Sequence, residues 1–222
     1  MAPLTLHNEC VSAGTQKHVR TLRTALKPFH FVLAGGTALA LYLGHRVSVD
    51  LDFFSEDPFS TENIYREIGA AGLNPLVLQE EKGTLTLSIA ETKVSFFHYP
   101  YPFVEKKVKW KGLSVAGVID IAAMKLLAIA QRGARRDFVD LYYISQDIPF
   151  RKIAENVVRR FGGNRINPVH LGKSLIYFVD AECDPDPQYV GRSRLVWKEV
   201  KQFFVKNVRQ MVLDLEAAKK EI

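Results

Sequence analysis

The chain of 222 residues has little cysteine and no long apolar run. Cys10 and Cys183 form no Cys-x-x-Cys pair and lie far apart, which disfavours a disulfide framework or a zinc site. No apolar run approaches the roughly 20 residues of a membrane-spanning helix. The first residues also lack the basic-then-apolar layout of a signal peptide. We therefore expect a reduced, soluble, cytoplasmic protein without membrane association.

Several common catalytic motifs are absent as well. The sequence has no GxxxxGK[ST] motif, which disfavours a P-loop NTPase, and neither GxSxG nor HExxH occurs. The six histidines are scattered and form no cluster with metal-ligand spacing. These absences exclude the most easily recognised hydrolase and zinc-protease sites.

The composition indicates an ordinary globular protein with a proper core. Hydrophobic residues make up 47% of the chain and charged residues 24%. The length allows one large domain or two small ones. The net charge of +6 is a mild basic excess, which is compatible with a polyanionic substrate without demonstrating one.

Hydrophobic periodicity and turn residues divide the chain near residue 115. The first part, 1–115, reads as a mixture of helices and strands. Its helices are expected at 14–29, 38–43 and 61–71, and its strands at 31–34, 47–54, 75–80, 84–90 and 93–99. The basic segment 106–111 is typical of a solvated hairpin or loop. The second part, 116–222, is mainly helical, with helices expected at 119–131, 137–145, 153–161, 168–179 and 195–220 and a loop at 180–187.

The most informative pattern is Gly35-Gly36-Thr37 followed by Asp50 and Asp52. On a strand, residues i and i+2 point to the same face, so the two aspartates are expected side by side. Two such carboxylates repel each other, and a divalent cation is the usual relief. A Gly-Gly turn at a helix start offers backbone N–H groups to an anion. A phosphate site beside a magnesium site suggests chemistry on a nucleoside triphosphate.

A second cluster of charged residues lies in the helical part. Asp120 is placed near a helix start, where a carboxylate suits the helix dipole. Lys125 lies in an apolar stretch, so it either reaches solvent or meets an anion. Asp137 and Asp140 share one helix face. Together with three preceding arginines, they either bind triphosphate and a nucleic-acid backbone or form a salt-bridged junction of two helices. The three arginines are Arg132, Arg135 and Arg136.

The segment 35–54, GGTALALYLGHRVSVDLDFF, resembles the AbiEii/AbiGii nucleotidyltransferase family, whose members are toxins of abortive-infection and toxin–antitoxin systems. The resemblance covers about residues 30–145, whereas 150–222 adds no recognisable motif. A wider superfamily that includes DNA polymerase beta and kanamycin nucleotidyltransferase shares the glycine turn and the Asp-x-Asp strand. The family's downstream motif is matched by Asp120, Lys125, Arg132, Arg136, Asp137 and Asp140.

The resemblance implies an α+β nucleotidyltransferase fold, in which a mixed β-sheet is flanked by helices and a C-terminal helical region completes the active site. It implies transfer of a nucleoside monophosphate from an NTP, such as ATP or GTP, to an acceptor. The acceptor would be RNA such as tRNA, or protein, and a cognate antitoxin would neutralise the toxin. Two alternatives stay open, namely a catalytically silent nucleotide- or RNA-binding protein and an aminoglycoside-type small-molecule nucleotidyltransferase.

Roles for individual residues follow from the resemblance. Two aspartates are expected to hold one or two Mg²⁺ ions, and the glycine turn with its threonine is expected to contact the phosphates. Lys125 would pair with the triphosphate. Asp137, which is preferred over Asp140 for this role, would act as a base or would orient Lys125 or the acceptor. The metal ligands are Asp50 and Asp52, and the phosphate-binding residues are Gly35, Gly36 and Thr37.

The sequence departs from the wider superfamily at one place. A third carboxylate is usual on a neighbouring strand, but Ser95 stands at the corresponding position. Glu91 lies nearby in an expected turn. The general base or third ligand would then come from Asp137 or be missing. His45 and Arg46, just ahead of the Asp-x-Asp strand, either line the site or stabilise the turn.

Overall fold

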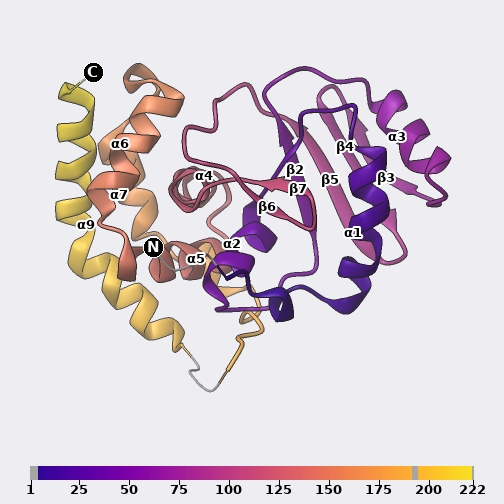
Figure 1. Ribbon diagram of the computed structural model, residues 1–222. Helices are drawn as coiled ribbons and strands as arrows, with labels where there is room; N and C mark the ends of the chain where they lie inside the picture. Colours follow the sequence, from indigo (N-terminus) through magenta and orange to yellow (C-terminus); the bar gives the residue numbers. More distant parts are fainter. Residues whose placement is uncertain (1–4, 192–194, 222) are drawn as a thin grey trace. The chain divides into compact units, whose positions relative to one another are not determined.

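The computed structural model describes residues 5–191 and 195–221, and the chain forms two compact units. Unit 1 comprises Met1–Pro102 and Lys106–Ala116. Unit 2 comprises Phe103–Glu105 and Gly117–Ile222. Figure 1 shows the sheet of unit 1 and the helices of unit 2.

Unit 1 is built on a mixed sheet of seven strands within the described residues. The spatial order is β3-β4-β5-β2-β1-β7-β6. β2 runs parallel to β5 and β1 runs parallel to β7, whereas the other pairs are antiparallel. The strands are β1 Val32–Ala34, β2 Leu51–Ser55, β3 Leu76–Glu81, β4 Thr84–Ile89, β5 Thr92–His98, β6 Val108–Trp110 and β7 Leu113–Val115.

The helices of unit 1 are η1 Asn8–Cys10, α1 Ala13–Ala25, α2 Gly35–Leu43 and α3 Thr61–Ala70. Two of the longer helices begin within a residue of the expected places, but α2 begins at Gly35 rather than at residue 38, and η1 was not predicted. The Ser60 side chain caps α3 by accepting from the backbone N–H of Asn63 at 3.2 Å. α1 ends earlier than the predicted residue 29 because a residue before proline, here Lys27 before Pro28, is disfavoured in helical geometry.

β2 is shorter than the predicted strand 47–54. It begins at Leu51, one residue after Asp50. The backbone carbonyl of Val49 accepts from the Thr15 hydroxyl at 2.8 Å. The carbonyl of Asp50 accepts from the Thr37 hydroxyl. These carbonyls are therefore bonded to helix side chains rather than to a neighbouring strand, and Asp50 lies just outside the ladder.

The basic segment 106–111 is a hairpin rather than a loop, and its strands extend the sheet beyond β1. Lys111 and Gly112 join β6 to β7, and both have positive φ, at 47° and 90°, as two-residue hairpin turns require. Trp110 is buried, and its indole N–H donates to Asn8 Oδ1 at 2.8 Å. The short strands gave too weak an alternation to be recognised in the sequence.

Alternation along β2 separates the core from the candidate site. Leu51, Phe53 and Ser55 are buried, whereas Asp52 and Phe54 are half-buried on the other face. The Phe53 ring stacks on that of Phe96 from β5, with centroids 5.4 Å apart. The core face thus fixes the register of β2, and with it the face on which Asp52 points.

Unit 2 is helical, as the sequence predicts. Its elements are α4 Val118–Arg132, α5 Arg135–Asp147, α6 Phe150–Phe161, η2 Gly163–Arg165, α7 Pro168–Leu175, α8 Val179–Glu182 and α9 Trp197–Lys220. α9 packs along α6 and α7, and α4 contacts α5, α6 and α7 (Figure 1).

Two boundaries in unit 2 differ from the prediction. The helix expected over 168–179 ends at Leu175, because Ile176 and Tyr177 make tight turn bonds to carbonyls three residues back. α8 then occupies the start of the segment 180–187 that was expected to be a loop. Among the helices of the described residues, none combines the length and apolarity needed to cross a membrane.

Candidate active site

The glycine turn between β1 and α2 lies against the Asp52 carboxylate. Gly35 is the first residue of α2 and has φ of +68°, a conformation that favours glycine. A Cβ atom added at Gly35 would lie 2.7 Å from Asp52 Oδ2. No side chain caps the start of α2 from Ala34. The first turn of the helix, with its positive dipole end, therefore lies next to one of the two predicted metal ligands.

Thr37 holds the Asp50 segment against the same turn of α2. Its hydroxyl donates to the backbone carbonyl of Asp50 and lies 2.9 Å from Ser48 Oγ. Thr37 is 1% exposed. The single proton of this hydroxyl is therefore used within the protein, and the expected contact of Thr37 with phosphates stays a prediction. Thr37 fixes the backbone of Asp50 near the glycine turn.

No third carboxylate lies beside Asp52 in the sheet. Asp52 pairs with Ala34 on β1 and with Ser95 on β5. Ser95 is buried, and its hydroxyl accepts from Thr86 Oγ1 at 3.5 Å. Glu91 is exposed in the β4–β5 turn. Within residues 5–191 and 195–221, no group of three or more His, Cys, Asp or Glu residues could hold a metal ion.

The donor set nevertheless fits a magnesium ion that takes most of its ligands from a substrate. Asp52 places a hard carboxylate oxygen beside the start of α2, and the backbone of Asp50 is held at the same turn. Mg²⁺ is usually bound by one or two carboxylates together with substrate phosphates and water, rather than by a cage of protein ligands. Two aspartates beside the glycine turn would therefore suffice for such an ion, whereas a metal held by protein alone would need more ligands.

The guanidinium group of Arg46 lies against the glycine turn. A Cβ atom added at Gly36 would lie 2.5 Å from Arg46 Nη2. The Arg46 side chain is buried, and its Nη1 donates to the carbonyl of Val47 at 3.2 Å. His45, the preceding residue in the sequence, is also buried. Arg46 therefore brings a positive charge to the start of α2, and whether it lines a nucleotide site stays a prediction.

In unit 2, Lys125 is held between two buried carboxylates. Its Nζ lies 2.7 Å from Asp137 Oδ1 and 2.6 Å from Asp140 Oδ2. Arg132 adds a two-pronged contact to Asp137, at 2.7 Å from Nε and 3.1 Å from Nη2. Both aspartates are fully buried and Lys125 nearly so. The cluster joins α4 to α5 and balances two positive against two negative charges.

The position of Asp137 makes it a poor base. Burial raises the pKa of its carboxyl, but the neighbouring Lys125 and Arg132 outweigh this effect and hold the pKa below its ordinary value. A carboxylate with a lowered pKa and two cationic partners has little tendency to take a proton from an alcohol. The geometry favours the other role considered for Asp137, which is to orient Lys125, and Asp140 shares that role.

Asp120 serves the fold of unit 2. It lies in the first turn of α4, fully buried, and accepts from the backbone N–H groups of Val104 and Glu105 at 3.4 and 3.0 Å. Asn156 Nδ2 donates to the same carboxylate at 3.0 Å, and Arg160 Nη1 donates to the Asp120 carbonyl at 2.8 Å. Asp120 therefore ties α6 and the segment 103–105 to the start of α4.

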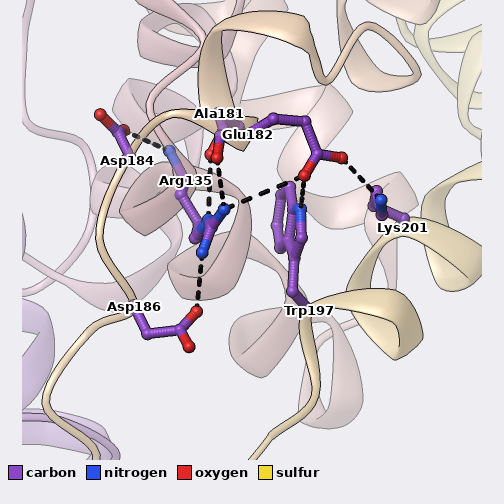
Figure 2. Close-up of polar contacts among 7 residues, drawn as sticks. All are labelled: Arg135, Ala181, Glu182, Asp184, Asp186, Trp197 and Lys201. Carbon is purple, nitrogen blue, oxygen red and sulfur yellow. Dashed lines mark hydrogen bonds and ion pairs between the residues drawn. The ribbon is translucent and has the colours of Figure 1, made fainter.

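Arg135 is a structural clamp rather than an anion-binding residue (Figure 2). Its guanidinium donates to the carbonyls of Ala181 and Glu182 at 2.9 Å each and to Asp186 Oδ1 at 2.8 Å. It also lies 5.1 Å from the ring centroid of Trp197, at a distance typical of a cation–π contact. Arg132, through its contact with Asp137, and Arg135 both hold helices together. The third arginine, Arg136, is exposed.

Comparison with known proteins shows the family of the chain. Residues 20–214 match the family described as nucleotidyl transferase AbiEii toxin, type IV toxin–antitoxin system. An uncharacterized protein of Aquifex aeolicus (strain VF5) is 38% identical over 185 residues, which is 81% of this chain and 87% of the relative.

Solved structures share the fold. A candidate nucleotidyltransferase of Helicobacter pylori superposes with a TM-score of 0.60 at 18% identity, covering 96% of this chain and 98% of that one. MenT4, a nucleotidyltransferase toxin of Mycobacterium tuberculosis H37Rv, superposes with a TM-score of 0.56 at 16% identity, covering 90% and 89%. The predicted nucleotidyltransferase fold is confirmed.

The chain belongs to the AbiEii nucleotidyltransferase toxin family, as the motifs in its sequence indicated. It is therefore a nucleotidyltransferase of the toxin type.

Proposed function

We propose that the protein transfers a nucleoside monophosphate from an NTP to an acceptor hydroxyl in a magnesium-dependent reaction. The observation that carries the proposal is the approach of the Asp52 carboxylate to the Gly35 turn. The bond from Thr37 adds support, because it keeps the backbone of Asp50 at the same turn of α2. A carboxylate pair for a cation and a helix start for an anion together suit the triphosphate tail of a nucleotide.

In the proposed reaction, an acceptor oxygen attacks the α-phosphorus and the bond to the bridging oxygen of the β-phosphate breaks. Pyrophosphate leaves, and the acceptor proton passes to solvent. Magnesium, when bound, would neutralise charge on the phosphate oxygens as the phosphoryl group moves in line. The backbone N–H groups of Gly35 and Gly36 would donate to a phosphate, and the Arg46 guanidinium would add positive charge beside them.

Lys125 is proposed as a second cationic contact for the triphosphate. An ammonium group carries three N–H donors, and Asp137 and Asp140 accept from two of them. The third would be offered to a phosphate oxygen. The two carboxylates keep Lys125 charged and fixed, so neither needs to act as the base. That unit 2 completes the active site stays a prediction.

For the acceptor we propose RNA such as tRNA, with a protein side chain as the other outcome of the test. The net charge of +6 suits a polyanionic acceptor. The family description places the toxin in a toxin–antitoxin system, from which we infer a cognate antitoxin. The expected nucleotide, ATP or GTP, stays a prediction. The cytoplasmic location stays a prediction as well.

The test is a labelling screen with the purified protein. Each of the four NTPs, labelled at the α-phosphate, is incubated with Mg²⁺ and with tRNA, total RNA, soluble protein or an aminoglycoside. We expect label in RNA, and we expect Asp52→Asn to reduce the rate on the order of 100-fold or more. Asp57→Asn, which removes an exposed carboxylate two residues beyond β2, is the matched control and should retain full activity.

Each outcome of the screen has a meaning. Labelled protein in place of RNA would change the acceptor class and keep the metal site. A labelled aminoglycoside would favour the small-molecule alternative. NTP binding without transfer to any acceptor would favour the silent-binding alternative. Equal labelling by Asp52→Asn and the unchanged protein would show that the site has been assigned wrongly.

A further inference from the structure

One row of side chains across the sheet contains a single carboxylate. In this row Thr86 on β4 pairs with Ser95 on β5, Ser95 pairs with Asp52 on β2, and Asp52 pairs with Ala34 on β1. Residues paired across neighbouring strands have side chains on the same face, with the strands about 4.8 Å apart. The places directly beside Asp52 are therefore filled by a serine and an alanine.

The next positions along the neighbouring strand supply no carboxylate either. On β5, the residues two places from Ser95 on the same face are Lys93 and Phe97. Lys93 is exposed and positively charged, and the Phe97 ring stacks on Phe54 with centroids 5.1 Å apart. The Ser95 hydroxyl is engaged with Thr86 and buried. No acid from β5 can therefore join Asp52 on its face of the sheet.

In two-cation sites the ions lie about 3.5–4 Å apart and repel each other, so negative ligands between them must offset that repulsion. In the row described above, Asp52 is the one carboxylate that could do so. From the row across the sheet we infer that this site takes one divalent cation together with the triphosphate, and not two. The inference rests on the proposed function. It also means that the strands directly beside β2 offer no second carboxylate in the row of Asp52 to help the acceptor lose its proton.

The cation count can be measured with Mn²⁺ as the probe. The full chain, in excess over a non-hydrolysable α,β-methylene NTP, is titrated with Mn²⁺, and bound Mn²⁺ is counted by electron paramagnetic resonance after equilibrium dialysis. We expect one Mn²⁺ per bound nucleotide and no spin coupling between ions. Two coupled Mn²⁺ ions per nucleotide in the unchanged protein would overturn the inference.

A variant that restores the missing acid makes the test sharper. Ser95→Asp is expected to raise the ratio from one Mn²⁺ per nucleotide to two, with the spin coupling of neighbouring ions. Ser88→Asp is the matched control on β4, because Ser88 pairs with Lys93 rather than with β2, and it should leave the ratio at one. A ratio of one in folded Ser95→Asp would contradict the role given to this position.

The outcomes separate the inference from the proposed function. If Ser95→Asp fails to fold, the count on the unchanged protein still decides between one cation and two. If Asp52→Asn binds Mn²⁺ and nucleotide as the unchanged protein does, the metal site itself is wrong. If the unchanged protein binds one Mn²⁺ that Asp52→Asn loses, both the site and the count are supported.

Discussion

Replacing Gly35 with alanine should damage the site more than the fold. The added Cβ would lie 2.7 Å from Asp52 Oδ2 and 3.3 Å from Asp52 Cβ, so the carboxylate must move. The residue must also keep a φ of +68°, which costs a non-glycine residue about 1–2 kcal/mol. The positive φ and the close contact with Asp52 together should lower the free energy of unfolding by about 1–3 kcal/mol.

The expected effect on transfer is larger. Displacement of a positioned group by about 1 Å costs on the order of 100-fold in rate. Gly35→Ala should therefore transfer nucleotide on the order of 100-fold more slowly at a temperature at which it is fully folded. The assay combines urea denaturation, which gives the free energy of unfolding, with initial rates of incorporation from a labelled NTP.

Two other glycines serve as controls for the strain. Gly44 ends α2 with φ of +65°, and a Cβ there would lie 2.7 Å from His7 Nδ1, away from the carboxylates. Gly72 has φ of +83° and nothing within 4 Å, so its alanine variant measures the backbone cost alone. Both variants should lose stability and keep the transfer rate. A folded Gly35→Ala that transfers at the full rate would refute the reasoning.

Three further predictions concern unit 2. Asp137→Asn leaves Lys125 and Arg132 facing a neutral amide and should cost about 3–5 kcal/mol in urea denaturation, whereas the exposed Asp57→Asn should change stability by less than about 0.5 kcal/mol. The pKa of Asp137 is lowered from 3.8, so its carboxylate contributes fully to the stability of the folded protein well above pH 3.8. That contribution is lost as the pH falls through the lower folded pKa. The unchanged protein should therefore lose stability more steeply than Asp137→Asn between about pH 5 and 3. Arg135→Ala should expose the segment 181–186 to limited proteolysis, and unchanged cleavage would contradict the clamp.

The glycine turn and the Asp-x-Asp strand were predictable because their geometry is local. A glycine pair between an apolar strand and an apolar helix allows few conformations, and alternation along β2 fixes the face of Asp52. The start of β2 was not predictable. It depends on the Thr37 hydroxyl reaching the carbonyl of Asp50, thirteen residues later, and residue types do not reveal which backbone group a hydroxyl will choose.

The charged residues of unit 2 show the same limit. That Asp137 and Asp140 share a face follows from helical spacing, and the structure adds that both face Lys125. The partners of Arg135 lie 46 to 51 residues away and include two backbone carbonyls, so nothing in the sequence distinguishes it from an anion-binding arginine. Its role depends on how α8 and α9 pack on α5.

The most direct measurement is a calorimetric titration of a non-hydrolysable NTP into the purified protein, with Mg²⁺ and with EDTA. The account predicts binding that requires Mg²⁺ and that Asp52→Asn weakens by on the order of 100-fold, while Asp57→Asn binds as the unchanged protein does. Tight binding to Asp52→Asn, or binding that is equally strong in EDTA, would contradict the assignment of the nucleotide site to the start of α2.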